Sequence, residues 1–245
     1  METQAARPGP LFHVRAVLFD LDSAVVDLRG MKRVASDAAA RAMLAAGADF
    51  PFTPDEAGDI LFGEYLADLE SGTLFEAFLR RHHRRALGMG QHQVDRITAA
   101  AVNAYLRAKT LRTEPFAGVR PTLVALARAG LRLGVLTDAP RFKAYQRLDA
   151  AGLSDFFEFV LAPAEGARGG ERPFRAALDL LGLPPHQVLV VGGRAGQETG
   201  PGALGVRSAW ARYGSPASPV PLEADVVLER VEDLIRHLPL AGDRR

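Results

Sequence analysis

Residues 14–27 read Val-Arg-Ala-Val-Leu-Phe-Asp-Leu-Asp-Ser-Ala-Val-Val-Asp. The apolar, β-branched run 14–19 predicts a buried strand, and it stops where two carboxylates, Asp20 and Asp22, stand two residues apart. In an open α/β sheet the carboxyl ends of the strands are where ligands bind. A strand end closed by polar turn residues is the alternative interpretation, but such a turn would normally supply Gly or Asn. We therefore predict a site for phosphate, metal or proton-transfer chemistry here.

The composition is that of an ordinary folded protein. The chain has 245 residues, enough for one core with an inserted lobe or for two small domains. A net charge of +1 argues against nucleic-acid or membrane partners. The absence of Cys excludes disulfides and thiolate chemistry. No apolar run reaches the roughly 18 residues of a membrane helix, so we expect a cytoplasmic protein.

The first half of the chain predicts an all-helical insert. Residues 1–12 carry two prolines and no periodicity, and we expect a disordered tail there. Residues 30–112 predict a cap domain of four helices, one of which starts at Thr53-Pro54-Asp55-Glu56. The expected apolar face of the first helix consists of Met31, Val34, Ala38, Ala42 and Leu44.

The second half alternates between helix and strand. Further strands are predicted at residues 131–136, 159–161, 188–191, 206–210 and 225–228. Helices are predicted at residues 119–129, 141–151, 172–181 and 231–238. This alternation predicts an α/β fold, a parallel sheet covered by helices on both faces. The core domain would comprise residues 13–29 and 113–245, with the cap inserted between them.

Several segments together resemble the haloacid dehalogenase (HAD) superfamily, in particular its phosphoglycolate phosphatase and β-phosphoglucomutase branch with an α-helical cap. Phe19-Asp20-Leu21-Asp22 is similar to the first motif of that family, and Leu136-Thr137-Asp138 is similar to the second. Residues 115–119 and 182–192 match segments that flank the later motifs. The resemblance implies a Rossmann-like core and a phosphatase that acts on a small phosphorylated metabolite.

The resemblance also implies a role for each motif residue. Asp20 would attack phosphorus and form an aspartyl phosphate, while Asp22 would protonate the leaving oxygen and then activate water. Thr137 would donate a hydrogen bond to the phosphoryl group, with Asp138 beside it at the same edge. In the family a Lys neutralises the phosphoryl group, and Mg²⁺ bridges the nucleophile and the phosphate.

The chain departs from the family pattern at positions that matter for charge. Arg168 stands where the family has its Lys, and it keeps the positive charge. The fourth motif, normally Gly-Asp with a second Asp four residues later, reads Gly192-Gly193-Arg194-Ala195-Gly196-Gln197, so both acids are missing. Ser23-Ala24 stands where the family usually has Gly-Thr.

The missing acids predict weak or unusual metal dependence. Loss of a cation beside a phosphate forfeits roughly 4 kcal/mol per unit-charge pair at ~4 Å and an effective dielectric of ~20. Even half of that slows turnover more than about tenfold. The remaining candidate metal ligands are Asp20, the carbonyl of Asp22, and Glu198. Asp138 is a second acid that could stand in for the missing ones. Alternatively, Arg168 and Arg194 supply the positive charge and the pocket binds an inorganic anion without metal.

Three functions follow from these residues. The first is a phosphatase that uses Asp20 and Asp22. The second is a catalytically inactive binding or regulatory protein that keeps an anion pocket, which the missing acids favour. The third is a metal-free dehalogenase acting through Asp20 on carbon, which the retained Asp22 argues against.

Overall fold

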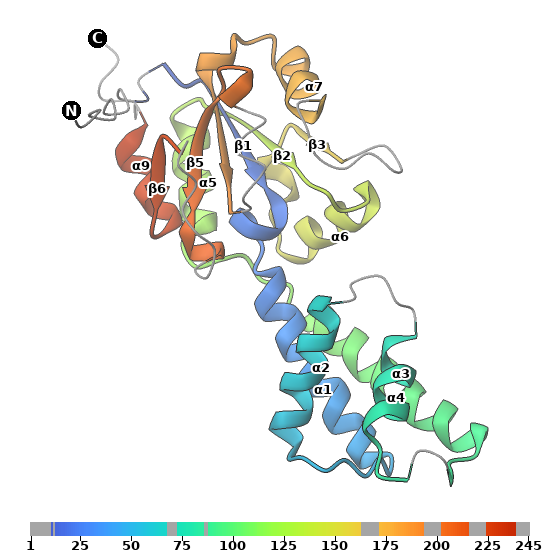
Figure 1. The fold of residues 1–245 in the computed structure, drawn as a ribbon. Coiled ribbons are helices and arrows are strands. Elements are labelled where there is room, and N and C mark those ends of the chain that lie inside the picture. Colours follow the sequence, from blue (N-terminus) through green and yellow to red (C-terminus); the bar gives the residue numbers. More distant parts are fainter. Residues whose placement is uncertain are drawn as a thin grey trace, which may run out of the picture. The chain divides into compact units, whose positions relative to one another are not determined.

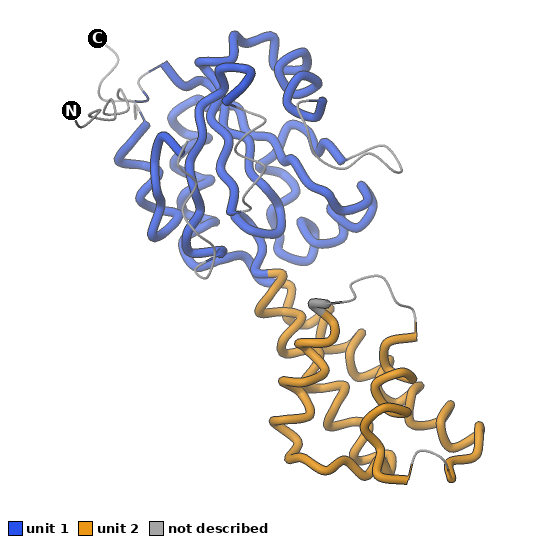
Figure 2. The backbone as a smooth tube through the Cα atoms, viewed as in Figure 1, with its two compact units in different colours: residues 1–27, 114–245 blue, residues 28–113 orange. Residues whose placement is uncertain are grey.

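The computed structural model describes residues 11, 13–67, 73–85, 88–162, 172–193, 202–215 and 224–238. The chain divides into two compact units, residues 1–27 with 114–245 and residues 28–113 (Figure 2). Within the expected tail, Leu11 is described and is buried in the core of the first unit.

The first unit is built on a parallel sheet of six strands (Figure 1). The strands lie in the order β3-β2-β1-β4-β5-β6, and every described pair is parallel. Their bounds are β1 Ala16–Asp20, β2 Arg132–Leu136, β3 Phe159–Leu161, β4 Val188–Gly192, β5 Arg207–Ala211 and β6 Val226–Leu228. The predicted α/β fold with a parallel sheet is confirmed.

Alternating side chains of β1 bury two separate cores, one on each face of the sheet. Val17 and Phe19 point into a cluster that also contains residues of α5, α6 and α9. Ala16 and Leu18 point into a second cluster, which contains residues of α7. The helices are α5 Val119–Arg128, α6 Arg141–Ala150, α7 Arg172–Leu181 and α9 Leu234–His237. A strand with helices on both faces is buried throughout, which explains its continuous apolar run.

Short helical turns complete the first unit. A π-helical turn, η1, covers Leu21–Val25, and 3-10 turns cover Ser154–Phe156 (η3), Pro185–Gln187 (η4), Arg212–Gly214 (η5) and Val231–Asp233 (η6). The prediction of a single helix over 231–238 is therefore wrong. The segment is helical but divides into the 3-10 turn η6 and the four-residue helix α9.

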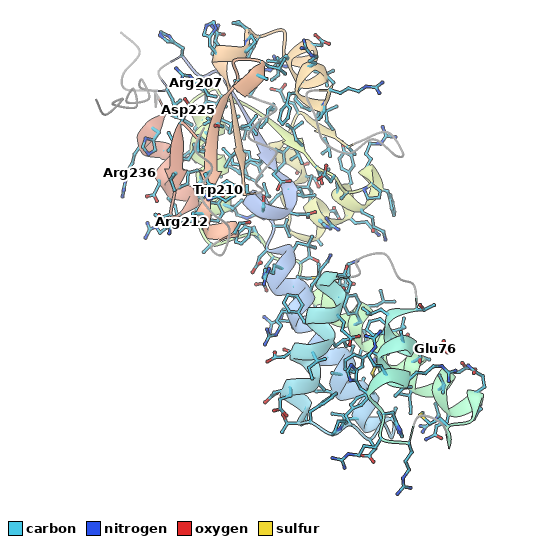
Figure 3. The ribbon with its side chains drawn as sticks, in the orientation of Figure 1. Glu76, Arg207, Trp210, Arg212, Asp225 and Arg236 are labelled. Carbon is cyan, nitrogen blue, oxygen red and sulfur yellow. The ribbon has the colours of Figure 1, made fainter. Side chains whose placement is uncertain are left out.

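Polar side chains support the edge of the sheet at β5 and β6. Arg207 Nη1 lies 2.7 Å from Asp225 Oδ1, and the backbone N–H of Ser208 donates to Asp225 Oδ2 at 2.8 Å (Figure 3). Trp210, further along β5, is fully buried. Because Trp210 is the single tryptophan of the chain, its fluorescence reports the unfolding of this unit.

The two places where the chain leaves and re-enters the first unit are hydrogen-bonded to each other. Val26 and Pro115 form an antiparallel bridge. The N–H of Asp27 donates to the carbonyl of Glu114 at 3.2 Å, and that of Phe116 donates to the carbonyl of Val25 at 3.0 Å. The two chain segments that flank the inserted unit are thus hydrogen-bonded to each other within the first unit.

The second unit consists of four helices, α1 Leu28–Ala45, α2 Pro54–Ala67, α3 Leu74–His82 and α4 Gln91–Leu111. The predicted apolar face of α1 is confirmed at Met31, which is buried, but is wrong at Val34, which is 41% exposed. The residues that α1 buries are Met31, Ala35, Ser36, Ala39, Ala40 and Met43. These side chains are mostly small, which lets α2 and α4 approach α1 closely.

The start of α2 agrees with the sequence prediction. Thr53 and Glu56 form a capping box, in which the N–H of Thr53 donates to Glu56 Oε2 at 2.7 Å and the N–H of Glu56 donates to Thr53 Oγ1 at 3.3 Å. These hydrogen bonds lower the pKa of Glu56. Further along α2, Glu64 lies 2.8 Å from Arg81 Nη1 and 2.7 Å from His82 Nε2, which ties α3 to α2.

Within the described ranges, no helix is both long and apolar enough to cross a bilayer.

A glycine inside β2 is required by close packing. A Cβ at Gly134 would lie 2.7 Å from ring atoms of Phe159 and 2.9 Å from a methyl group of Leu18. We expect Gly134→Ala to lower the free energy of unfolding by about 1–3 kcal/mol, measured by Trp210 fluorescence in urea. Gly63→Ala in α2, where a Cβ meets nothing within 4 Å, is the control and should not lower the free energy of unfolding. An unaltered transition in Gly134→Ala would contradict the packing argument.

Candidate functional site

The candidate site lies at the carboxyl end of β1, the strand at which the chain order of the sheet reverses. β1 pairs with β2 on one side and with β4 on the other. Asp20, its last residue, is 3% exposed. Directly after it the chain turns through η1, which closes with a hydrogen bond of 2.8 Å from the N–H of Val26 to the carbonyl of Leu21. Such a reversal point is where open α/β sheets bind ligands.

Thr137 follows β2 at the same edge. Asp20 is in register with Leu136, so Thr137 lies one residue beyond Asp20 on the neighbouring strand. The N–H of Thr137 donates to the carbonyl of Leu161 at 3.0 Å, and its Oγ1 accepts from the N–H of Ala139 at 3.0 Å. A hydroxyl that accepts in this way can still donate its own hydrogen. The structure thus brings Asp20 and Thr137 to neighbouring strand ends, with the partly buried Asp138 next to Thr137.

Asp22 is held by an arginine that the sequence prediction missed. Arg147 Nη1 lies 2.5 Å from Oδ1 and 2.6 Å from Oδ2 of Asp22. Both side chains are well covered, with 6% of Asp22 and 15% of Arg147 exposed. Both oxygens of Asp22 thus contact the same guanidinium nitrogen. Arg147 lies on α6 beside the buried Ala144 and Leu148, but its spacing in the sequence does not identify Asp22, 125 positions away, as its partner.

Ser23 joins the ends of β1 and β4. Its hydroxyl donates to Asp20 Oδ2, and its Oγ accepts from the N–H of Gly193 at 2.9 Å. Ser23 is 4% exposed. In the sequence, Ser23 is visible only as a departure from the family pattern. Its hydrogen bond with Gly193 joins residues 170 positions apart.

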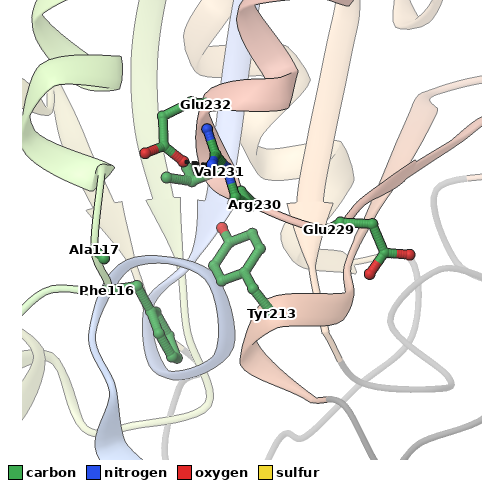
Figure 4. Close-up of a pocket in the computed structure, with 7 residues that line it drawn as sticks. All are labelled: Phe116, Ala117, Tyr213, Glu229, Arg230, Val231 and Glu232. Carbon is green, nitrogen blue, oxygen red and sulfur yellow. Dashed lines mark ion pairs between the residues drawn. The ribbon is translucent and has the colours of Figure 1, made fainter.

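Tyr213 supports the η1 turn from the side of η5. Its hydroxyl donates to the carbonyl of Ala24 at 2.9 Å, and its ring meets that of Phe116 edge to face at 5.2 Å. It lines a cavity of about 280 Å³ together with Phe116, Ala117 and residues 229–232 (Figure 4). Burial raises the pKa of Tyr213, and the carboxylates of Asp20 and Glu232 raise it further. Tyr213 therefore stays neutral and keeps its donor.

Three predicted site residues, Arg168, Arg194 and Glu198, lie outside the residues that the structure describes. Their predicted roles in charge neutralisation and metal binding stay predictions.

The described residues do not fit the Mg²⁺ that the family resemblance implies. Mg²⁺ takes oxygen ligands in near-octahedral geometry and is usually anchored by one or two carboxylates. In the described part of the chain, no three His, Asp or Glu side chains converge on a possible ion position. Gly193 carries no side chain, and Asp20 Oδ2 already accepts from Ser23. The carboxylate of Asp22 is turned to Arg147.

The ion pair of Asp22 and Arg147 predicts a strong energetic coupling. Arg147→Met leaves a covered carboxylate unpaired, so we expect the free energy of unfolding to fall by about 3–5 kcal/mol. The double variant Asp22→Asn/Arg147→Met should lose less than the sum of the two single variants. The exposed pair of Arg212 and Glu229, at 3.0 Å, is the control and should couple by less than about 1 kcal/mol. Equal coupling of the two pairs in urea titrations would contradict the assignment.

Removal of the Tyr213 hydroxyl tests the support of η1. Tyr213→Phe leaves the Ala24 carbonyl without its donor, so unfolding should become easier by about 1–3 kcal/mol at pH 8. Since folding raises the pKa of this phenol, its contribution to stability is complete below the unfolded pKa of about 10 and is lost as the pH rises further. The stability gap between wild type and Tyr213→Phe should therefore narrow above pH ~10. The exposed Tyr145→Phe is the control, and a constant gap would refute the raised pKa.

Comparison with known proteins agrees with this architecture. Residues 14–195 match the family model of the haloacid dehalogenase-like hydrolases. The chain is 28% identical over 233 residues to the glyceraldehyde 3-phosphate phosphatase of Pyrococcus furiosus, covering 92% of this chain and 93% of the relative. It is 26% identical over 229 residues to the N-acetylmuramic acid 6-phosphate phosphatase of Pseudomonas aeruginosa, covering 91% and 93%. Among solved structures it resembles a HAD-superfamily hydrolase of subfamily IA from Geobacter sulfurreducens, with a TM-score of 0.65, 18% identity and coverage of 95% and 99%.

Proposed function

The chain belongs to the haloacid dehalogenase-like hydrolases, and from this membership we propose that it hydrolyses small phosphate esters at Asp20. The observation that carries the proposal is the register of β1 and β2, which supports a joint role for Asp20 and Thr137 at one strand edge. The names of two relatives specify different phosphate esters, glyceraldehyde 3-phosphate and N-acetylmuramic acid 6-phosphate. We therefore propose a small phosphorylated metabolite as the substrate class and leave the carbon skeleton open.

In the proposed reaction, a carboxylate oxygen of Asp20 attacks phosphorus while the bond from phosphorus to the ester oxygen breaks. The phosphoryl group moves to Asp20, and the leaving oxygen takes a proton. Water then attacks the aspartyl phosphate, which releases inorganic phosphate and restores the carboxylate. Thr137 donates its hydroxyl hydrogen to a phosphoryl oxygen, where negative charge builds up. This hydroxyl is held in place by the N–H of Ala139.

Asp22 limits the rate in this proposal. It is the acid/base that the family resemblance implies, but both of its oxygens contact Arg147. We propose that these contacts slow proton transfer through Asp22, because they hold its carboxylate on Arg147. Together with the missing carboxylate at position 193, this supports slow turnover that depends little on Mg²⁺.

The test of this proposal is turnover of p-nitrophenyl phosphate at several Mg²⁺ concentrations. We expect Asp20→Asn to reduce kcat by at least about a hundredfold, because it removes the nucleophile. Asp149→Asn, which changes an exposed carboxylate on α6, should keep the wild-type rate. If Asp20→Asn turned over as fast as wild type, Asp20 would lose its assigned role.

A second candidate function is a catalytically inactive protein that binds an anion for regulation. The ion pair between Asp22 and Arg147 favours it, because a permanently closed pair removes the acid/base. Calorimetric titration with inorganic phosphate distinguishes the two. Phosphate binding without any turnover dependent on Asp20 would support the inactive protein, whereas turnover that Asp20→Asn abolishes would exclude it. Binding that strictly requires Mg²⁺ would reject a metal-free anion pocket.

A further inference from the structure

Ser23 and Gly193 are in direct contact through a hydrogen bond, and each bears on which side chain fits at the other position. The hydroxyl of Ser23 is placed between the carboxylate of Asp20 and the backbone N–H of Gly193. β1 and β4 are paired, with Phe19 opposite Val191, so both residues lie just beyond the ends of adjacent strands. Ser23 and Asp20 are almost completely buried, so this bridge is shielded from water.

The space around Gly193 is filled while Ser23 is present. A Cβ at Gly193 would lie 3.1 Å from Ser23 Cβ, 3.1 Å from the carbonyl oxygen of Ala211 and 2.9 Å from Ser215 Oγ. Gly214 packs directly against the carbonyl of Ser23 on the η1 turn. A side chain at position 193 is therefore crowded by Ser23, Ala211 and Ser215.

The direction of the hydrogen bonds determines what Asp20 can bind. The N–H of Gly193 points to Ser23 Oγ, and the O–H of Ser23 points to Asp20 Oδ2, so both hydrogens are directed toward the carboxylate. Successive hydrogen bonds of this kind polarise and strengthen one another. Asp20 Oδ2 thus receives the positive end of a dipole. A cation at that oxygen would have to displace the Ser23 hydrogen, and from β4 it would meet an N–H in place of a carboxylate.

We propose that Ser23 is a positioning residue that holds Asp20 in place of a metal ion, and that the Ser23–Gly193 pair excludes Mg²⁺ from Asp20. The proposal rests on the proposed function only in assigning the reactive carboxylate to Asp20. Its test uses Mg²⁺ alone, without substrate, so that it can fail while the phosphatase proposal holds, and the reverse.

The experiment is calorimetric titration of Mg²⁺ into wild type, Ser23→Gly, Gly193→Asp, Ser23→Gly/Gly193→Asp and Ser23→Ala/Gly193→Asp. We expect no Mg²⁺ binding by wild type or by the single variants at millimolar concentrations. Ser23→Gly/Gly193→Asp supplies the carboxylate and removes both the Ser23 hydroxyl and the Ser23 Cβ contact, and it should bind Mg²⁺ at least tenfold more tightly than Gly193→Asp. Ser23→Ala/Gly193→Asp is the matched control, since it lacks the hydroxyl but keeps the crowding Cβ. It should bind more weakly than the double variant with glycine.

Two results would overturn the proposal. The first is Mg²⁺ binding by wild type that Asp20→Asn abolishes. The second is equal Mg²⁺ affinity of Gly193→Asp and Ser23→Gly/Gly193→Asp, both shown to be folded by circular dichroism and Trp210 fluorescence. If the glycine double variant does not fold, the comparison of wild type with Asp20→Asn decides alone. Absence of Mg²⁺ binding in both proteins then supports the exclusion, and its presence in wild type alone refutes it.

Discussion

The structure of the site depends on one constraint, a carboxylate buried at the end of a central strand. β1 is buried at all five of its positions and is hydrogen-bonded to a strand on either side. A buried charge is costly unless hydrogen bonds compensate for it. For Asp20 part of the compensation comes from Ser23, three residues further along. The π-helical turn η1 brings that hydroxyl back to the strand end, and Tyr213 holds the turn through the carbonyl of Ala24.

The two aspartates of the first motif have different contact partners. Asp20 contacts a neutral hydroxyl, whereas Asp22 contacts a guanidinium with both oxygens. Hydrogen bonds to a hydroxyl can be exchanged for contacts to a ligand at modest cost, but a covered ion pair is expensive to break. The asymmetry places two different constraints on the two carboxylates of one motif.

The sequence predicted the central strands β1 and β4 well, because strands buried on both faces produce continuous apolar runs. The start of α2 was predicted from Thr53-Pro54-Asp55-Glu56, a strictly local signal, and the structure shows a capping box there. The buried face of α1 was not predicted, since that helix packs through alanines, which carry little hydrophobic signal compared with the exposed Val34. The site was predicted in part. Asp20 and Thr137 are visible as strand ends, but the contacts of Ser23 and Arg147 join residues more than a hundred positions apart and follow from tertiary packing alone.

The antiparallel bridge between Val26 and Pro115 has a consequence for how this chain can vary. Because the entry and exit of the helical insert are already hydrogen-bonded within the sheet unit, an insert of any length closes the same short gap. The entropy of closing a loop grows only slowly with its length, so the size of the insert has little influence on the stability of the sheet. The helical unit can therefore be lengthened, shortened or exchanged as a module, while the strand ends that carry Asp20 and Thr137 keep their positions.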